Sequence, residues 1–185
     1  MKKTFFLSIL ATLLISVAVY GQNNDKLVST KTSITFFSST PAEDIEAQNT
    51  ASVSTIDKNS GVVVFSVPMQ GFEFEKRLMQ KHFNNDKFLD TKTYPEAKFK
   101  ANITNLEEIN FSKDGTYPAQ VEGNLTIKGK TNPIKEKGTI IIKNGTTKVD
   151  SKFNVTLADY GITFVKGKPA SNIAKTVEVT VQAEY

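Results

Sequence analysis

Apolar and polar residues alternate along most of the chain with a period of two. Over 173–185, apolar side chains occupy one parity, and threonine, glutamine and glutamate occupy most of the other. A period of two places successive side chains on opposite faces of a strand, so one face is buried and the other is in water. The same alternation recurs over 149–157, 121–127 and 99–103. The pattern therefore predicts a protein built mainly of half-buried β-strands.

Turn residues separate these runs. Asn-Ser-Gly lies at 59–61, Lys-Asp-Gly at 113–115 and Asn-Gly at 144–145. The Asn-Gly pair suits a two-residue hairpin, because both of its central residues must adopt a positive φ. About eight strands with short connections predict an all-β fold, an antiparallel barrel or sandwich, and argue against alternating strands and helices.

One segment departs from the alternation. After a strand expected over 62–67, Pro68 and Gly71 end the extended run, and apolar residues then recur at spacings of three to five, at Phe74, Leu78, Met79, His82 and Phe83. This spacing predicts one short amphipathic helix of about ten residues, with Glu73 and Glu75 in its first turn. In a closed barrel, a helix of this size would cover an opening or a seam.

The N-terminal segment has the features of an export signal. Lys2 and Lys3 precede an apolar run over 5–19, and small residues end at Gly21. This pattern predicts a secretory signal peptide over 1–21 and a mature domain over 22–185. The apolar run is shorter than the roughly 20 residues that span a bilayer comfortably. We therefore expect a periplasmic or secreted protein.

The composition narrows the possible functions. The 185 residues include one histidine and neither cysteine nor tryptophan, so disulfides, thiol nucleophiles and cysteine-ligated metals are excluded. Any histidine-dependent catalysis would have to use His82. A single arginine and the lack of a basic cluster argue against binding of nucleic acid. We expect neither a metal nor a cofactor nor catalysis, which leaves binding, carriage or scaffolding.

Four segments, in order, resemble one known family. They are FSVPM followed by FEF at 65–74, LMQKHFN at 78–84, YPEAKFK at 94–100 and VEGNLTIKGKT at 121–131. From about residue 49 onward, the chain resembles the YceI-like family of exported bacterial proteins. The resemblance implies a lipocalin-like antiparallel barrel that binds a polyisoprenoid or another long-chain amphiphile in its interior. The segment SSTPAED at 38–44 departs from the more apolar first hairpin expected for the family.

The resemblance directs attention to apolar residues on one strand face and around the helix. The candidate lipid contacts are Phe65, Val67, Met69, Phe72, Phe74, Leu78, Met79, His82, Phe83 and Phe99. Lysines beside turn glycines could meet a phosphate headgroup, namely Lys128, Lys130, Lys166 and Lys168. The apolar residues could equally fill a solid core, and the lysines could be ordinary solvated turn residues.

We therefore predict non-catalytic binding, carriage or sequestration of an isoprenoid or fatty-acyl lipid. Transient membrane contact and a homodimer are compatible with this role. Two alternatives remain open. An eight-stranded outer-membrane β-barrel would show the same alternation with its apolar face outward, and the run 177–185, which ends on an aromatic residue, suits it. A lipid-modifying enzyme could use the same pocket through His82.

Overall fold

The computed structural model describes residues 25–29, 31–163 and 173–185; the predicted signal peptide lies outside them, as do Lys166 and Lys168. The described residues form eleven strands, one α-helix and three short 3₁₀ helices. The strands are β1 (Lys26–Ser29), β2 (Lys31–Ser39), β3 (Asp44–Asn49), β4 (Val53–Asp57), β5 (Val62–Pro68), β6 (Phe72–Phe74), β7 (Glu96–Ile103), β8 (Gly115–Ile127), β9 (Lys130–Lys143), β10 (Thr146–Thr156) and β11 (Thr176–Glu184). The helices are η1 (Met69–Gly71), α1 (Arg77–Asn84), η2 (Leu106–Glu108) and η3 (Leu157–Tyr160).

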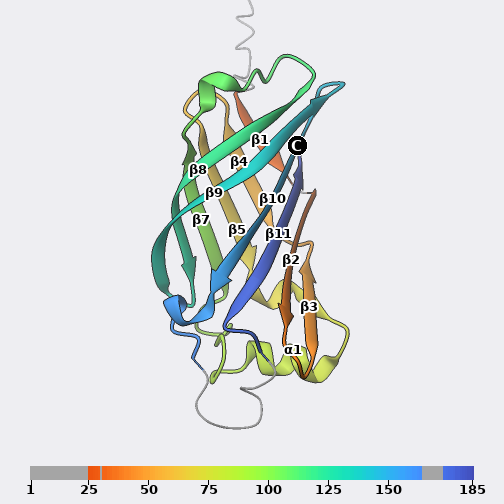
Figure 1. The fold of residues 1–185 in the computed structure, drawn as a ribbon, viewed down its shortest axis with the longest axis vertical. Helices are drawn as coiled ribbons and strands as arrows, with labels where there is room; N and C mark the ends of the chain where they lie inside the picture. Colours follow the sequence, from red (N-terminus) through yellow and green to blue (C-terminus); the bar gives the residue numbers. More distant parts are fainter. Residues whose placement is uncertain (1–24, 30, 164–172) are drawn as a thin grey trace, which may run out of the picture.

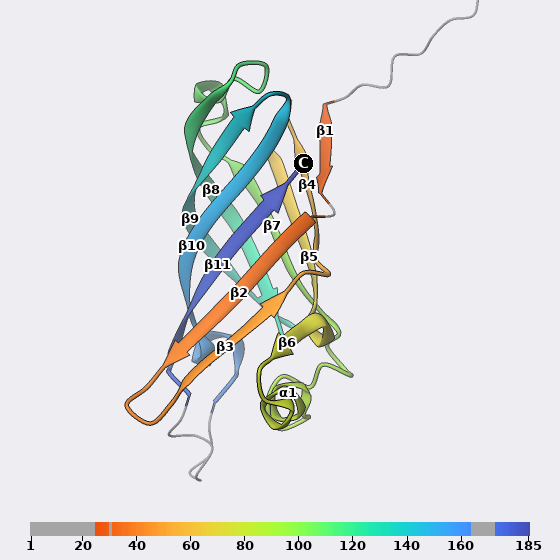
Figure 2. The same ribbon diagram turned by 90° about the vertical axis from the view of Figure 1, so that its right-hand side faces the viewer.

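All the strands join one antiparallel sheet, in the order β1-β4-β5-β7-β8-β9-β10-β11-β2-β3-β6. The sheet curls into a barrel, with α1 at one end (Figures 1 and 2). Two segments bring its edges together. β1 pairs with β4, whereas β2, one residue later in the chain, pairs with β11. In the same way, β5 pairs with β4 and β7, whereas β6, beyond η1, pairs with β3.

The prediction of an all-β antiparallel barrel is confirmed, but the prediction of about eight strands was too low. Two of the extra strands arise because two extended segments are each divided. β1 and β2 lie on either side of Thr30, and β5 and β6 lie on either side of η1. Each half then pairs with a different neighbour, so one run of alternating residues contributes two strands.

The predicted helix exists, but it begins later than its spacing indicated. α1 starts at Arg77, and no acidic residue lies in its first turn. Phe74 and Glu73 belong instead to β6, where they pair with Ala47 and Gln48 of β3. The unsatisfied edge of β3 offers residues 72–74 a hydrogen-bonded ladder, and this tertiary pairing overrides the helical spacing.

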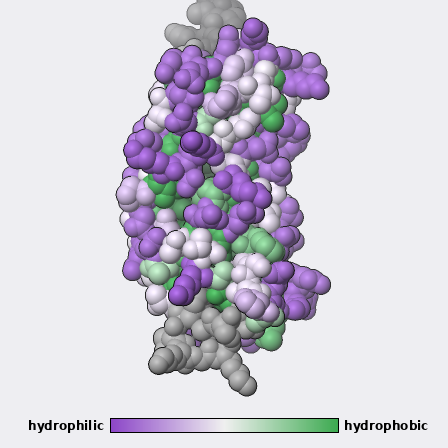
Figure 3. Space-filling view, in the orientation of Figure 1, coloured by the Kyte–Doolittle hydropathy of each residue, from purple (hydrophilic) through white to green (hydrophobic). Residues whose placement is uncertain are grey.

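The sheet has an apolar inner face and a polar outer face. In β7, Ala97, Ala101 and Ile103 are buried, whereas Lys98 and Lys100 between them are exposed. The outer surface is accordingly hydrophilic over most of the view in Figure 3. Close packing of β7 against β8 requires a glycine at Gly123, in the fourth family-like segment. A Cβ at this position of β8 would clash with the Lys100 carbonyl oxygen of β7.

Buried polar side chains join β2 and β3 to the β4–β5 side of the barrel, where the described residues show no ladder. Thr32 Oγ1 donates to the Ser52 carbonyl at 2.5 Å. Asn49, which is fully buried, donates from Nδ2 to the Pro68 carbonyl at 2.7 Å. Its Oδ1 accepts from the Ala51 N–H and the Ser52 hydroxyl, both at 2.9 Å. We call this junction the seam.

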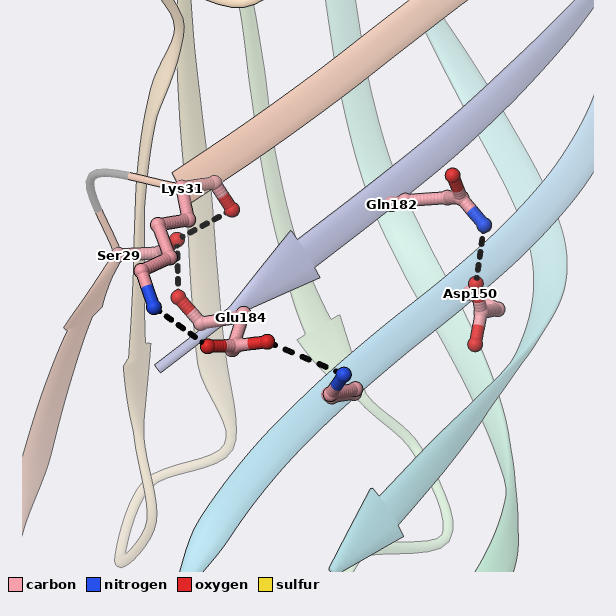
Figure 4. A network of polar contacts seen from close by, with 6 residues as sticks. Ser29, Lys31, Asp150, Gln182 and Glu184 are labelled. Carbon is pink, nitrogen blue, oxygen red and sulfur yellow. Dashed lines mark hydrogen bonds and ion pairs between the residues drawn. The ribbon is translucent and has the colours of Figure 1, made fainter.

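The seam continues to the C-terminal residue. Ser54 Oγ lies 2.8 Å from the Tyr185 hydroxyl, and burial raises the pKa of Tyr185 to about 12. Ser29 Oγ lies 2.6 Å from the Glu184 carbonyl and 3.0 Å from the Lys31 carbonyl (Figure 4). These side chains hold β1, β2, β4 and β11 together where backbone pairing changes partner.

An exposed ion-pair network lies outside this junction. The Glu184 carboxylate accepts from Lys31 Nζ at 2.7 Å and lies 3.1 Å from Lys148 Nζ (Figure 4). The two lysines hold the pKa of Glu184 below its ordinary value. Because the pairs are solvent-exposed, they contribute little to stability compared with the buried seam.

Replacing Asn49 should open the seam. Asn49→Ala leaves the Pro68 carbonyl, the Ala51 N–H and the Ser52 hydroxyl without this partner, and each buried unsatisfied group costs about 1–3 kcal/mol. We expect the free energy of unfolding in urea to fall by at least about 2 kcal/mol. Asn124→Ala, on the exposed face of β8, is the matched control and should change it by less than about 0.5 kcal/mol. Equal effects of the two variants would contradict the role of the seam.

Candidate functional site

The barrel encloses a cavity of about 1170 Å³, so its interior is hollow rather than filled by its own side chains. Its deep wall includes Ile56 and Ile140, which are 1% and 2% exposed. At the other end it is lined by Leu78 of α1, which is 64% exposed, and by His82, which is also exposed. The cavity therefore opens beside α1. We call this end, lined by Lys76, Leu78, His82 and Lys87, the mouth.

All ten residues that the sequence proposed as lipid contacts line this cavity. They are Phe65, Val67, Met69, Phe72, Phe74, Leu78, Met79, His82, Phe83 and Phe99. The register explains why distant residues meet: Phe65 of β5 pairs with Phe99 of β7, and their ring centroids lie 6.4 Å apart. Their placement is a finding of the structure, and their contact with a lipid stays a prediction.

A phenylalanine cluster holds α1 against the barrel. Phe83 of α1 is buried, and its ring stacks on Phe36 of β2 at a centroid distance of 5.6 Å. Phe72 and Phe74 of β6 approach Phe83 edge-on or tilted, at 5.5 and 5.0 Å. Phe88, after the helix, lies 6.2 Å away. Offset and edge-to-face ring pairs are favourable beyond the area they bury, so this cluster fixes the position of the helix beside the mouth.

The two described lysines proposed for a headgroup lie elsewhere. Neither Lys128 nor Lys130 is among the described residues that line the cavity. Lys128 adopts a positive φ in the turn between β8 and β9, and its Nζ donates to the Phe88 carbonyl at 2.5 Å. Lys128 therefore ties this turn to the segment that follows α1. Lys130 is exposed next to Gly161.

The sequence reasoning named only part of the cavity wall, and two of the residues that it missed are informative. Phe36 and Phe37 are adjacent, so the alternation did not show which of the two rings points inward. In the structure, Phe37 is the more exposed of the two. Glu136 lies between Lys135 and Lys137, a run that is typical of a solvated strand. It nevertheless lines the cavity, and burial raises the pKa of its carboxyl.

The described residues offer little further chemistry. Within 25–29, 31–163 and 173–185, no group of three or more His, Cys, Asp or Glu side chains is arranged to hold a metal ion. Among the same residues, we find no helix with the length and apolarity needed to cross a membrane. The arrangement that remains is a large apolar cavity with polar and charged side chains mainly at its mouth.

A curled antiparallel sheet around an apolar cavity with one helix beside its mouth defines the class of lipocalin-like barrels. The chain belongs to the YceI-like domain family, whose model matches residues 13–185. The resemblance seen in the four sequence segments is thus confirmed.

Solved structures share this fold. A polyisoprenoid-binding domain from Saccharophagus degradans superposes with a TM-score of 0.73 at 15% identity, covering 87% of this chain and 97% of that one. BcnA from Burkholderia cenocepacia gives a TM-score of 0.68 at 18% identity, covering 83% and 96%. A UPF0312 protein of Pseudomonas putida strain W619 is 33% identical over 111 residues, 55% of this chain and 51% of the relative. The chain thus spans about half the length of the curated relatives it matches.

Removing the central ring of the cluster should loosen α1. Phe83→Ala deletes a buried aromatic side chain, a change that typically costs about 3–5 kcal/mol. We expect an unfolding free energy lower by about 3 kcal/mol and faster amide hydrogen exchange in Arg77–Asn84. Leu78→Ala, on the exposed face of the same helix, is the control and should lie within about 0.5 kcal/mol of the parent. Unchanged exchange in Phe83→Ala would contradict the anchoring role of Phe83.

Proposed function

We propose that the protein binds a long-chain amphiphile, of the polyisoprenoid class, in its cavity and carries or sequesters it without catalysis. The observation that carries this proposal is the hollow of about 1170 Å³ with its mainly apolar wall. Its size exceeds the roughly 300–1,000 Å³ of most small-molecule sites, as a long chain requires. The fold shared with a polyisoprenoid-binding domain adds support.

The hydrophobic effect is strong enough to drive such binding. A chain with about 15 buried methylene-sized groups gains roughly 12 kcal/mol, at about 0.8 kcal/mol each. Loss of translational, rotational and chain freedom takes back about 4–15 kcal/mol. Because the cavity is already formed, little further ordering of the protein is required. With the smallest of these costs the net gain is about 8 kcal/mol, which corresponds to a Kd of about 1 μM.

The distribution of charge orients the ligand. Most ionisable side chains among the described lining residues lie near the mouth. Lys76 is ion-paired with Glu43 at 2.9 Å, and His82 and Lys87 can face a polar headgroup. The deep wall is apolar, with Ile56, Ile140 and Val63 among its buried residues. The tail therefore lies against the deep wall, and the polar group of the ligand lies in the half of the barrel nearer α1.

The polarity of the barrel favours a lipid carrier over the outer-membrane barrel that the sequence left open. A barrel embedded in lipid has apolar residues on its outer face. Here the outer face carries residues such as Lys98 and Lys100, and the apolar residues point inward. Export through the predicted signal peptide, to the periplasm or beyond, is part of the proposal and is tested by fractionating the native host. A homodimer also stays a prediction.

Contact with a membrane is the natural route of loading. Leu78 is 64% exposed on α1 at the mouth, where it could insert into a bilayer surface as lipid enters. Leu78→Asp should slow the transfer of a fluorescent polyprenol from vesicles severalfold. Val28→Asp, at an exposed apolar residue of β1 far from α1 (Figure 2), is the control and should leave the rate unchanged. Equal transfer rates for the two variants would contradict contact through α1.

Filling the cavity tests the function directly. Val67 of β5 lines the cavity, whereas Val64 of the same strand lies on the opposite face. Val67→Trp places an indole in the space that the tail needs, and we expect affinity for a fluorescent polyprenol to fall at least about tenfold. Val64→Trp is the matched control and should bind as the parent does. Phe74→Asp, which places a charge on the same cavity wall, is a second variant. Normal binding by both variants in folded form would contradict the cavity as the site.

A further inference from the structure

Glu136 interrupts an apolar row inside the barrel. In β9, Ile134, Glu136 and Ile140 share the inward face, and Lys135 and Lys137 are exposed on the other. A carboxylate placed among apolar side chains is costly unless it has a partner. Within the described residues, the partly buried side chain of Glu136 makes no hydrogen bond or ion pair, and the neighbouring Lys135 is bonded to Glu122 at 2.8 Å. The chain therefore keeps an unpaired acceptor on its cavity wall.

The hydrogen-bonded ladder of the barrel wall is incomplete beside Glu136. The ladder between β9 and β10 ends at the pair Gly138–Ser151, and the two strands diverge toward the α1 end (Figure 1). Ser151 Oγ donates to the Lys137 carbonyl at 2.7 Å where the ladder stops. Hydrophobic residues are visible within the polar face of Figure 3, which has the same orientation. We call this break between β9 and β10 the side opening.

A second, smaller pocket of about 110 Å³ occupies the side opening. It shares five residues with the main cavity, namely Leu125, Ile134, Glu136, Phe153 and Val155. Its other side is polar: Asn132 Nδ2 donates to the Asp159 carbonyl at 2.9 Å, and Asn154 also lines it. Glu136 thus stands where a polar niche joins the apolar cavity.

We propose that Glu136 is a recognition point for the ligand: it accepts a hydrogen bond from a hydroxyl or ammonium group of the bound amphiphile at the side opening. This inference rests on the proposed lipid binding and adds the chemistry that the site selects. A hydrogen-bond donor satisfies the carboxylate, whereas a phosphate or carboxylate of the ligand would be repelled by it. The cavity thus favours alcohols and amines over acids of the same chain length at this point.

Three amphiphiles of equal chain length test the inference: hexadecylamine, hexadecanol and palmitate. Each is titrated into delipidated protein, and its affinity is measured by displacement of a fluorescent polyprenol. Hydrogen bonds to charged groups are among the stronger ones, so the parent should bind the amine or alcohol about tenfold more tightly than palmitate. Glu136→Leu should abolish this preference and keep tail binding. Glu136→Gln, which preserves the shape of the side chain, should lose the preference for the amine.

Glu122→Gln is the matched control, because Glu122 lies on the exposed face of neighbouring β8. It should retain the preference of the parent. An unchanged preference in Glu136→Gln and Glu136→Leu, with the polyprenol still bound, would overturn the role of Glu136 and leave the proposed function intact. Failure of the parent to bind the polyprenol or any of the three amphiphiles would instead contradict the proposed function itself.

Discussion

The structure depends on closing a long antiparallel sheet around a space that its own side chains do not fill. Backbone hydrogen bonds between neighbouring strands do not by themselves close the barrel. At the seam, Thr32 and Asn49 donate to carbonyls of the facing segments, and Ser54 meets Tyr185. Buried polar groups must find partners, so these few bonds specify how the edges meet. Once the edges are fixed, the inward apolar side chains do not fill the enclosed space, and a cavity of about 1170 Å³ remains.

The same closure determines where the cavity opens. Division of the chain at η1 sends β6 across to β3, and this brings Phe72 and Phe74 to the end of the barrel that α1 occupies. Phe83 then packs into these rings and holds the helix beside the mouth rather than inside the barrel. The helix therefore leaves a passage lined by Leu78 and His82. A rigid wall and a mouth beside one short helix are the properties expected of a carrier for a flexible apolar chain.

Much of the fold could be predicted from the sequence, because a period of two shows which residues of a strand share the buried face. The alternation in β7, β10 and β11 is clear, and the residues proposed as contacts do meet around one cavity. The errors come from tertiary pairing, which local patterns do not contain. The spacing of Phe74 indicated a helix, yet Phe74 pairs with β3 in an antiparallel ladder. Glu136 resembled a solvated residue because it stands between Lys135 and Lys137, and the local sequence does not show that its side chain lines the cavity.

The most direct test of the central claim is native mass spectrometry of the protein purified from its own host, followed by release and identification of any bound molecule. The account predicts one long-chain lipid per barrel, lost in a folded variant whose cavity is filled by a tryptophan. A protein that leaves its host empty, and that takes up no polyprenol, fatty alcohol or fatty acid when delipidated, would contradict it.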